Sequence, residues 1–516
     1  YLYSGSEGSC EWVVDIKEAG LYNILVRYMP DVGKGSSIER NLYIDGGIPF
    51  EEAQNLVFKR MWESGNEITT DNRGNDIYPS NVETYQFMEC KIKDSLGYYN
   101  EYLSFYFTSG KHTIKLESVK EPMIIDYIKL YNEKIPSYEE VKQSYIEKGY
   151  KEIGSDVCIK IQAENAKYRS DSSLRMMNDR SSPKTEPSSP SLIKYNSFGG
   201  DTWKMPGEWA IWEFEVPESG LYKIVLKYKQ NYKRSLFVTR RIEIDGTVIC
   251  QEMNNVTFTY RSGWDNKILG DDNEPYLVYL EKGKHTIKVE ATMGEMSRFY
   301  NTAINSLSKL NEAYRKIFVI TGAVPDQYRD YELTKRVPEV FKIFEEQIEV
   351  LSNMSNELQE LTSERGSELA ILENLIYQMK EMVKNPDSVA EQKRLQNYKS
   401  NLGALGAWLL LLKEQPLLLD YILVASPEAE IPAAEANIFS KLIYEIKCLY
   451  YSYLTDYNTI GNLAEGDKSI TVWIDTGRDQ ANILKKLIDS SFTPKTGIGV
   501  NLKLVVSESV LPSIIS

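Results

Sequence analysis

Four aromatic residues stand outside the regularly alternating stretches of the sequence, in segments where loops are expected: Tyr195, Trp203, Trp209 and Trp264. Sugar rings present apolar C–H faces that stack on flat aromatic rings, and their hydroxyl groups need hydrogen bonds from side chains. This set of residues therefore predicts a saccharide site within residues 158–296. The alternative is that the same rings close one end of a β-sandwich against a neighbouring part of the chain.

Residues suited to enzyme chemistry are scarce. The two histidines, His112 and His285, both lie in the sequence Gly-Lys-His-Thr-Ile-Lys, which occurs at residues 110–115 and again at 283–288. A residue duplicated along with its strand is expected to serve the fold, which removes Ser-His-Asp, Cys-His and His-ligated metal schemes. No Asp or Glu stands in a recognisable catalytic setting, so we predict that the chain is not an enzyme.

The composition disfavours several classes of partner. A formal net charge of −14 argues against nucleic acid and anionic lipid surfaces. No stretch approaches the roughly 18 consecutive apolar residues of a membrane-spanning helix, so membrane attachment would require a lipid anchor outside this sequence. The five cysteines form no Cys-x-x-Cys pair and are expected to be isolated thiols: Cys10, Cys90, Cys158, Cys250 and Cys448.

Two stretches of the chain match at a constant offset of 200 residues. The matching groups are Trp12 with Trp212, Gly20-Leu21-Tyr22 with Gly220-Leu221-Tyr222, and Ile44-Asp45-Gly46 with Ile244-Asp245-Gly246. Apolar residues alternate in both copies, as in strands with one buried face. We therefore expect two antiparallel, jelly-roll-like β-sandwiches at residues 1–131 and 158–296, with Trp12 and Trp212 buried at equivalent places. The opening strand of the first copy is expected to be missing from this sequence.

The remaining segments are predicted to be helical or mixed. Residues 132–157 should form a helical linker. Over residues 297–465, apolar residues three and four apart predict a bundle of about five helices, with Gly403 and Gly406 at a close helix approach. Residues 466–516 show a strand, a helix and a second strand, a βαβ unit that needs a larger parallel sheet around it. The predicted fold class is multidomain α+β, and the sequence looks truncated at both ends.

Several motifs of the two repeats form a recognisable pattern. In the second repeat they are Ile161-Gln162-Ala163-Glu164, Trp209 to Pro217, Ile244-Asp245-Gly246, and Gly283 to Lys288. The first repeat follows the same pattern from its middle onward and ends in Ile125-Asp126-Tyr127-Ile128. These residues resemble the galactose-binding-like β-sandwich of carbohydrate-binding modules of families 6 and 35. In that family the opening Glu and the closing Asp commonly hold a structural calcium ion, so the resemblance implies Glu164 and Asp126 as metal ligands, one in each repeat.

A second pattern lies near the C-terminal end. It comprises Ile470 to Ile474, the loop Thr476-Gly477-Arg478-Asp479-Gln480, and Thr496-Gly497-Ile498 leading into Val500. This pattern resembles the start of an extracellular solute-binding protein of a carbohydrate ABC transporter. In that family the loop after the first strand faces the sugar cleft, so the resemblance implies Arg478 and Asp479 as sugar-contacting residues.

Together the resemblances imply a non-catalytic carbohydrate-binding protein, similar to large binding lipoproteins on the cell surface of Gram-positive bacteria. Such a protein would capture poly- or oligosaccharide as part of the substrate-binding component of an ABC transporter, with the transporter permease as a further partner. Two alternatives stay open: an accessory region of a polysaccharide-degrading enzyme, and a structural surface adhesin. The second sandwich is expected to be the better sugar binder, because Ser9 stands in the first repeat where Trp209 stands in the second.

Overall fold

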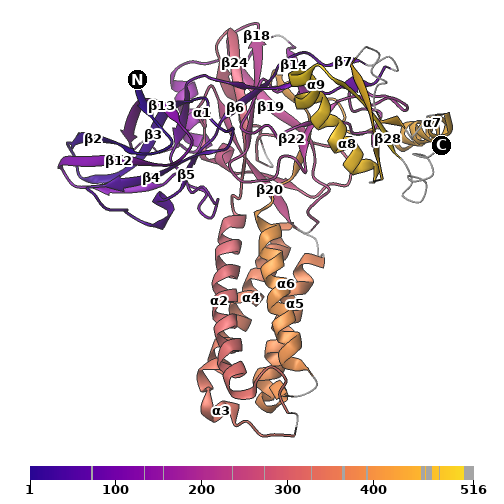
Figure 1. Ribbon diagram of the computed structural model, residues 1–516. Helices are drawn as coiled ribbons and strands as arrows, with labels where there is room; N and C mark the ends of the chain where they lie inside the picture. Colours follow the sequence, from indigo (N-terminus) through magenta and orange to yellow (C-terminus); the bar gives the residue numbers. More distant parts are fainter. Residues whose placement is uncertain are drawn as a thin grey trace.

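The computed structural model shows two β-sandwiches side by side, a helical bundle projecting from them and a small α/β unit at the C-terminal end (Figure 1). The predicted fold class, multidomain α+β, is confirmed. No described helix is both long enough and apolar enough to cross a membrane. The structure describes residues 1–504 except for positions 71–73, 133, 155, 235, 272–273, 327, 363–366, 391–392, 455–458, 461–467 and 476.

The first sandwich packs two antiparallel sheets around one core. One sheet has the strand order β1-β13-β3-β10, with β11 also paired to β3, and the other has the order β2-β12-β4-β5. Alternation along the strands directs one face inward, as in β11, where Phe105 and Phe107 are buried. The strands are β1 (Leu2–Ser4), β2 (Ser9–Ile16), β3 (Gly20–Pro30), β4 (Ile38–Ile44), β5 (Leu56–Phe58), β10 (Met88–Lys91), β11 (Ser104–Phe107), β12 (Gly110–Lys120) and β13 (Met123–Tyr131).

The second sandwich has the same plan with more strands. One sheet has the order β16-β17-β25-β19-β22, with β14 also on β25 and β23 on β19; the other has the order β21-β20-β24-β18-β15-β6-β9. Its strands are β14 (Cys158–Gln162), β15 (Tyr168–Arg169), β16 (Met176–Met177), β17 (Ser197–Gly200), β18 (Trp209–Val216), β19 (Gly220–Lys229), β20 (Phe237–Ile244), β21 (Val256–Thr259), β22 (Asp265–Ile268), β23 (Val278–Leu280), β24 (Gly283–Thr292) and β25 (Leu417–Ala425).

The two tryptophans that anchor the repeat occupy equivalent register positions. Trp12 pairs with Ile114 across β2 and β12, and Trp212 pairs with Ile287 across β18 and β24. Trp212 is fully buried, whereas Trp12 packs against the first core but stays partly exposed. The duplication therefore fixes the position of the ring but not the depth of its burial.

The closing strand of the second sandwich comes from beyond the helical bundle. β25 pairs with β19, as β13 pairs with β3, and both pairs shift register at one residue, Asp420 in β25 and Asp126 in β13. The bundle is thus inserted between β24 and β25, and it ends at Lys413 rather than at the expected residue 465. Every residue of β25 is buried, so this strand lacks the period-two pattern that alternation requires.

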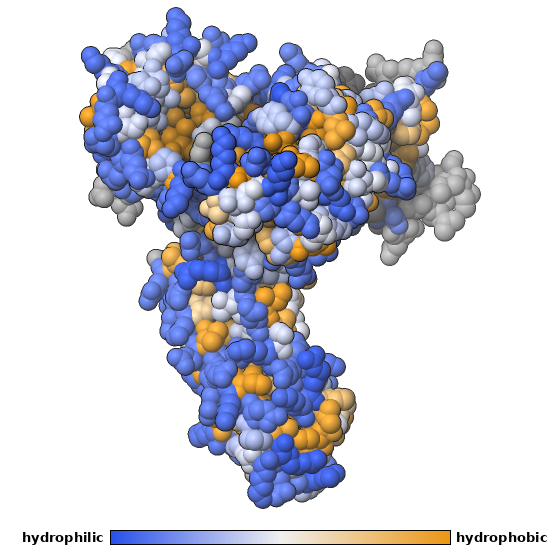
Figure 2. All heavy atoms as spheres, turned by 90° about the vertical axis from the view of Figure 1, so that its left-hand side faces the viewer, coloured by the Kyte–Doolittle hydropathy of each residue, from blue (hydrophilic) through white to orange (hydrophobic). Residues whose placement is uncertain are grey.

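Four long helices form the bundle: α2 (Met296–Thr321), α4 (Pro338–Thr362), α5 (Ser367–Lys384) and α6 (Arg394–Lys413), with the short α3 (Leu333–Arg336) beside them. Their apolar stripes share one core, which includes Leu351. The face of the bundle seen in Figure 2 is mostly hydrophilic, with apolar patches among the polar residues. The expected close approach at two glycines is wrong: a Cβ at Gly403 would meet nothing within 4 Å, and one at Gly406 would make only an ordinary contact with Leu307.

A hairpin of the first sandwich extends a sheet of the second. Strands β6 (Met61–Ser64) and β9 (Asn81–Thr84) pair with each other, and Trp62 of β6 pairs with Arg169 of β15. Between them lies the small ladder of β7 (Thr69–Thr70) and β8 (Asp76–Ile77). The predicted linker contains helix α1 (Tyr138–Glu147), which packs Tyr138 and Val141 into the second core. These contacts fix the two sandwiches against one another.

The C-terminal part contains helix α7 (Ile438–Leu454) and a three-stranded sheet. Strands β27 (Ser469–Ile474) and β28 (Gly499–Leu504) are parallel, and β26 (Thr459–Ile460) pairs antiparallel to β28. Helix α8 (Arg478–Leu487) connects the parallel strands, continuing through a π-helical turn (Ile488–Phe492) into α9 (Thr493–Thr496). The βαβ unit expected from the sequence is present, while α7 lies outside the bundle (Figure 1).

Candidate functional site

The four predicted sugar-binding aromatics do not gather in one place. Trp203 is fully buried in the second core, where it lies 5.4 Å from the ring of Phe198 and donates its indole N–H to the Glu208 carbonyl. Tyr195 is buried against Tyr78, with the ring centroids 5.4 Å apart. Both assignments as exposed sugar platforms are wrong, because these rings fill gaps between segments of the chain.

Trp264 is also buried, on the outer face of β19. Its indole N–H donates to Asp179 at 3.3 Å, and its backbone N–H donates to Glu435 at 3.2 Å. The segment after β25 lies over it, so the ring seals a contact between two loops. Arg478 and Asp479 begin α8, but their side chains lie outside the described residues.

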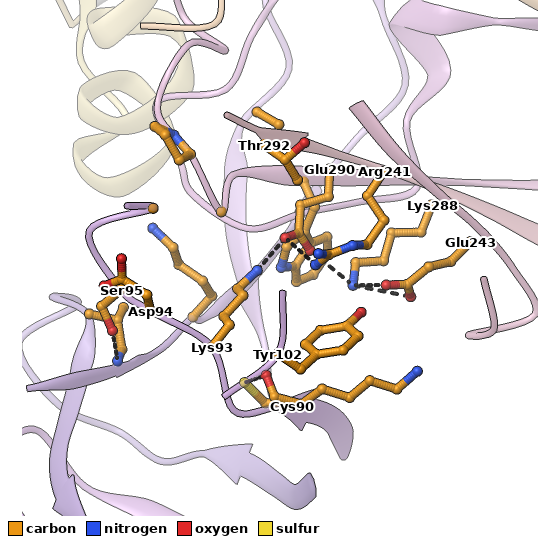
Figure 3. A pocket seen from close by; sticks show the side chains of 18 of the residues that line it. Cys90, Lys93, Asp94, Ser95, Tyr102, Arg241, Glu243, Lys288, Glu290 and Thr292 are labelled. Atoms are coloured by element: carbon orange, nitrogen blue, oxygen red, sulfur yellow. Dashed lines mark hydrogen bonds and ion pairs between the residues drawn. The ribbon is translucent and has the colours of Figure 1, made fainter. Parts of the chain in front are cut away.

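Trp209 alone of the four lines a pocket, of about 370 Å³, which lies between the two sandwiches (Figure 3). The floor is the outer face of the second sandwich. Strand register places Trp209, Glu290 and Arg241 in one row across β18, β24 and β20. The next row holds Ile211, Lys288 and Glu243.

The first sandwich supplies the wall of the pocket. β10 and the segment after it contribute Lys91, Lys93, Asp94, Tyr99 and Tyr102. Asp94 holds this segment in place by accepting backbone N–H groups from Leu96, Tyr98 and Tyr99. The pocket therefore exists only where both sandwiches meet, and neither repeat contains it alone.

Ion pairs across the pocket join the two sandwiches. Glu290 pairs with Lys93 from the wall and lies 3.4 Å from Arg241 on the floor. Lys288 bridges Glu243 at 3.3 Å and Glu290 at 3.5 Å, and Figure 3 shows these side chains pointing toward one another. Although burial alone would raise it, the pKa of Glu290 is held far below its usual range by the surrounding cations.

Two lysines of the wall lose part of their hydration. Burial lowers the pKa of Lys93 even though Glu290 lies beside it. Burial also lowers the pKa of Lys91, whose ammonium lies 5.2 Å from the ring centroid of Tyr102. Arg241 contacts the same ring, at 4.5 Å. The indole of Trp209 is only 7% exposed and lies 5.6 Å from the Lys288 ammonium, so it offers a small apolar surface among charged donors. That combination suits a polar ligand with an apolar face, such as a sugar ring.

Most residues of this pocket were not predicted from the sequence. Arg241, Lys288 and Glu290 occupy outward-facing positions of two alternating strands, where solvated charges are the usual expectation. One signal was available: these charges stand on neighbouring strands in register with Trp209. The wall could not be inferred, because its residues lie more than a hundred positions earlier in the chain.

The second sandwich offers oxygen ligands for a cation. Gln162 Oε1, Glu164 Oε2 and Asp420 Oδ1 are buried without a hydrogen-bond partner among the described residues. Burial raises the pKa of Glu164 to about 8, and Asp420 adds to this. Burial likewise raises the pKa of Asp420 to about 6, although Lys227 Nζ lies 2.5 Å from its Oδ2. Carboxylate and amide oxygens are the ligands that Ca²⁺ prefers, so this donor set fits a calcium ion.

This finding corrects the assignment of metal ligands to separate repeats. The second repeat does have a closing Asp, Asp420, which the bundle separates from Glu164 in sequence. In the first sandwich, Asp126 instead forms an ion pair with Arg27. Since Arg27 and Lys227 are 200 residues apart, both repeats place a cation beside the closing Asp. The difference lies in the other oxygens: Asp126, unlike Asp420, is not among the described carboxylates that are buried without a hydrogen-bond partner. The donor set of the second sandwich therefore has no counterpart among the described residues of the first.

The duplicated histidines make the same contacts in both repeats. His112 Nδ1 lies 2.7 Å from Asp45 Oδ2, and His285 Nδ1 lies 2.7 Å from Asp245 Oδ2. Each Asp also accepts the backbone N–H of the residue after the histidine. These contacts tie a β-turn to its neighbouring strand, which is the fold role expected from duplication.

One family model matches the chain. Residues 298–410 match the model described as "Bacterial solute-binding protein, 4-helix bundle domain". The bundle is therefore similar to that domain of bacterial solute-binding proteins. No curated protein matched the chain.

Solved structures match parts of the chain at low identity. A β-glucosidase from Paenibacillus barengoltzii matches at 16% identity over 23% of this chain and 9% of that one, with a TM-score of 0.14. A cycloisomaltooligosaccharide glucanotransferase from Paenibacillus sp. matches at 20% over 30% and 21%, with a TM-score of 0.20. A family 35 carbohydrate binding module from Clostridium thermocellum matches at 15% over 26% and 86%, with a TM-score of 0.19. The chain spans less than a quarter of the two enzymes, and TM-scores this low support no argument about it.

Proposed function

We propose that this protein binds saccharides without cleaving them, and that the pocket between the sandwiches is the binding site. The observation that carries the proposal is the pocket itself: about 370 Å³, with Trp209 on a floor of charged donors. This volume falls in the range of roughly 300–1,000 Å³ typical of small-molecule sites. The motifs shared with carbohydrate-binding modules support the same ligand class.

A binding role suits the electrostatics of the pocket better than catalysis. Glu290, the carboxylate nearest the centre of the ion-pair network, is kept ionised by three cations and cannot supply a proton near neutral pH. Incubation of the protein with oligosaccharides should release no new reducing ends. Sustained release by purified protein would favour the enzyme alternative.

The match of the bundle supports a finer proposal. We infer that the chain is part of the substrate-binding component of a carbohydrate ABC transporter, acting outside the cell and held at the membrane by a lipid anchor. The bundle, which leaves and re-enters the second sandwich, would then be a projecting contact surface for other components of the transporter. Co-purification with a sugar permease, lost on deletion of residues 297–413, would test this arrangement.

We also propose a structural calcium ion at Glu164, Gln162 and Asp420. The ion would supply further positive charge beside two buried carboxylates, of which Asp420 is paired with Lys227. Its role would be to fasten the opening strand β14 and the closing strand β25 together, since Gln162 pairs with Tyr421, next to Asp420.

Titration of the full chain tests the main proposal. Wild-type protein should bind at least one of a panel of plant and mucin oligosaccharides, measured by isothermal titration calorimetry. Trp209→Ala should lower that affinity by at least about tenfold, because removing an apolar side chain of this size from a contact costs roughly 1.5–3 kcal/mol. Tyr106→Ala, an exposed aromatic outside the pocket, is the matched control and should bind as wild type. Equal binding by Trp209→Ala and wild type would refute the site.

A further inference from the structure

Exposed aromatic side chains lie on the outward face of one sheet of the first sandwich, the sheet with the order β1-β13-β3-β10. Tyr3 of β1 is 62% exposed, and Tyr127 of β13 is 39% exposed. Strand register places Tyr127, Arg27 and Glu89 in one row across β13, β3 and β10. Tyr3 pairs with Ile124, which precedes Tyr127 on β13. Neither ring belongs to the core, so both stand on the same outward face.

The ring of Tyr127 is held in place by polar groups. Its hydroxyl donates a hydrogen bond to Glu89, and the Arg27 guanidinium lies 5.9 Å from its ring centroid. Arg27 is itself paired with Asp126 and also lies 5.1 Å from the ring centroid of Phe87. A positioned, partly exposed ring with charged hydrogen-bonding groups beside it suits a sugar unit, which presents both C–H groups and hydroxyls.

The second sandwich contains the same pair of residues but covers it. Lys227 pairs with Tyr421 across β19 and β25, as Arg27 pairs with Tyr127 across β3 and β13. The Lys227 ammonium lies 5.1 Å from the ring centroid of Tyr421. Tyr421 is only 3% exposed, because Ile431, from the segment after β25, packs against the apolar cluster to which it belongs. The second sandwich therefore covers this face with its own chain, whereas the first leaves the equivalent ring accessible.

The outward face of the first sandwich continues into the pocket between the sandwiches. Glu89 and Lys91 alternate along β10 with residues of the core, so their side chains point outward, and both residues line the pocket. Glu89 also accepts the hydrogen bond from Tyr127, so the aromatic face and the pocket meet at this carboxylate. A saccharide that contacts Trp209 in the pocket can therefore extend past β10 onto Tyr127.

We propose that the pocket is one end of a longer saccharide site, and that the outward face of the first sandwich binds further units of the same chain on Tyr127 and Tyr3. This inference rests on the proposed function, because it states that the ligand of that site is a polysaccharide chain and not an isolated mono- or disaccharide. A guanidinium has more N–H donors, and a carboxylate more lone pairs, than the contacts of Arg27 and Glu89 use, so both can also bind sugar hydroxyls. A second copy of this chain is another occupant that an exposed aromatic face can take, but only a ligand that also fills the pocket uses the shared edge at Glu89.

The length of the ligand tests the inference. The full chain is titrated by calorimetry with the disaccharide and the hexasaccharide of three series, derived from xylan, mannan and dextran. In a series that binds, the hexasaccharide should bind at least about tenfold more tightly, because burial of another ~60 Å² of apolar surface corresponds to that factor. A site confined to the pocket predicts only the small gain that comes from the larger number of ways in which a longer chain can bind.

Variants locate the additional contacts. Tyr127→Ala should remove most of the gain for the hexasaccharide while leaving the affinity for the disaccharide unchanged, whereas Trp209→Ala should weaken both. Tyr106→Ala is the matched control, because Tyr106 is 64% exposed on the outward face of the same sheet but pairs with Leu21 at the other end of β3. It should bind both ligands as wild type does. Melting temperatures within about 2 °C of wild type would confirm that both tyrosine variants fold.

The outcomes separate this inference from the proposed function. If the two lengths bind alike and Trp209→Ala weakens both, saccharide binding in the pocket stands and the extended site is overturned. If the hexasaccharide is preferred but Tyr127→Ala keeps that preference, the assignment to this face is overturned. If sedimentation velocity shows a dimer that Tyr127→Ala dissociates, the face joins two copies of the chain and the extended site is again overturned. If no saccharide binds at all, the proposed function fails and the inference falls with it.

Discussion

The two sandwiches share a strand plan but differ in what closes them. In the first, β13 follows β12 directly, and Asp126 is neutralised by Arg27 from β3. In the second, β25 returns only after the bundle, and Asp420 faces both Lys227 and the buried oxygens of the opening segment. Both repeats thus keep the register shift in the closing strand and the Asp at that position, while the residues around this Asp differ.

The comparison of the two closing strands shows how the inserted bundle is held in place. The bundle enters from β24 and leaves into β25, so both of its connections are strands of one sandwich. Arg240 secures the return, donating to the carbonyl groups of Trp203 and Gln415 just before β25. Arg40, at the matching position 200 residues earlier, donates to the carbonyl groups of Ser4 in β1 and Lys120 at the end of β12. In both repeats the same buried arginine therefore binds the segment just before the closing strand.

The largest expected difference between the repeats lies at the matched tryptophans. Trp212→Ala should cost about 3–5 kcal/mol of stability, because the ring is fully buried and leaves a cavity. Trp12→Ala should cost clearly less, since Trp12 stays partly exposed and its surroundings can adjust. Urea unfolding of each variant, followed by circular dichroism, measures both values. Equal costs would show that the two cores are packed alike.

The second largest difference expected between the sandwiches is their stabilisation by Ca²⁺. Added Ca²⁺ should stabilise the second sandwich by about 2.7 kcal/mol at a free concentration one hundred times its dissociation constant, and EDTA should reverse this. Asp420→Asn should abolish the response, whereas Asp126→Asn should leave it unchanged. Scanning calorimetry of the three proteins with and without Ca²⁺ makes the comparison. A response that survives Asp420→Asn would place the ion elsewhere.

The pH dependence of the second sandwich follows from the same carboxylates. Because the folded pKa of Glu164 is raised from 4.5 to about 8, the folded state holds a proton that the unfolded state releases in this range. In EDTA, stability should therefore fall as pH rises from about 5 to 8, by at most about 1.4 kcal/mol per pH unit for one group. Glu164→Gln should flatten this slope. A slope unchanged in the variant would mean that other groups control it.

The smallest difference is expected at the duplicated histidines, which should behave alike. Hydrogen bonding to Asp45 raises the pKa of His112. At His285 burial is the largest single effect and lowers the pKa, but Asp245 and the Glu281 carbonyl together raise it above its usual value. Each contact stabilises the fold below the unfolded pKa and is lost as pH rises through the raised folded pKa. His112→Gln and His285→Gln should lower the melting temperature slightly at pH 6 and less at pH 9, without changing saccharide affinity. A variant that loses binding while keeping its melting temperature would contradict this role.

Much of the fold could be predicted because its signals are local. Alternation of apolar residues and the offset of 200 residues predicted both sandwiches. Helical periodicity predicted the bundle, and the order of apolar segments predicted the C-terminal βαβ unit. β25 was missed because an uninterrupted apolar run, Leu417 to Leu419, follows the apolar end of α6 and reads as more helix. Without β25, the partner of Glu164 in the second repeat could not be found.

The site was predicted only in part, for a different reason. Whether an aromatic ring in a loop points outward depends on what the loop packs against, and Trp203 turns into the core while Trp209, six residues later, faces the neighbouring sandwich. The pocket itself arises from contact between two repeats. Such a site has no pattern in either repeat alone.

Hydrogen–deuterium exchange with and without a bound oligosaccharide tests the central claim most directly, because it locates the ligand without altering the protein. The account predicts slower exchange of backbone amides in residues 88–102 of the first sandwich and residues 286–293 of the second, both of which line the pocket. Exchange around Tyr195 and Trp264 should not change. Protection found only around Tyr195 and Trp264, with none in residues 88–102 or 286–293, would contradict the account.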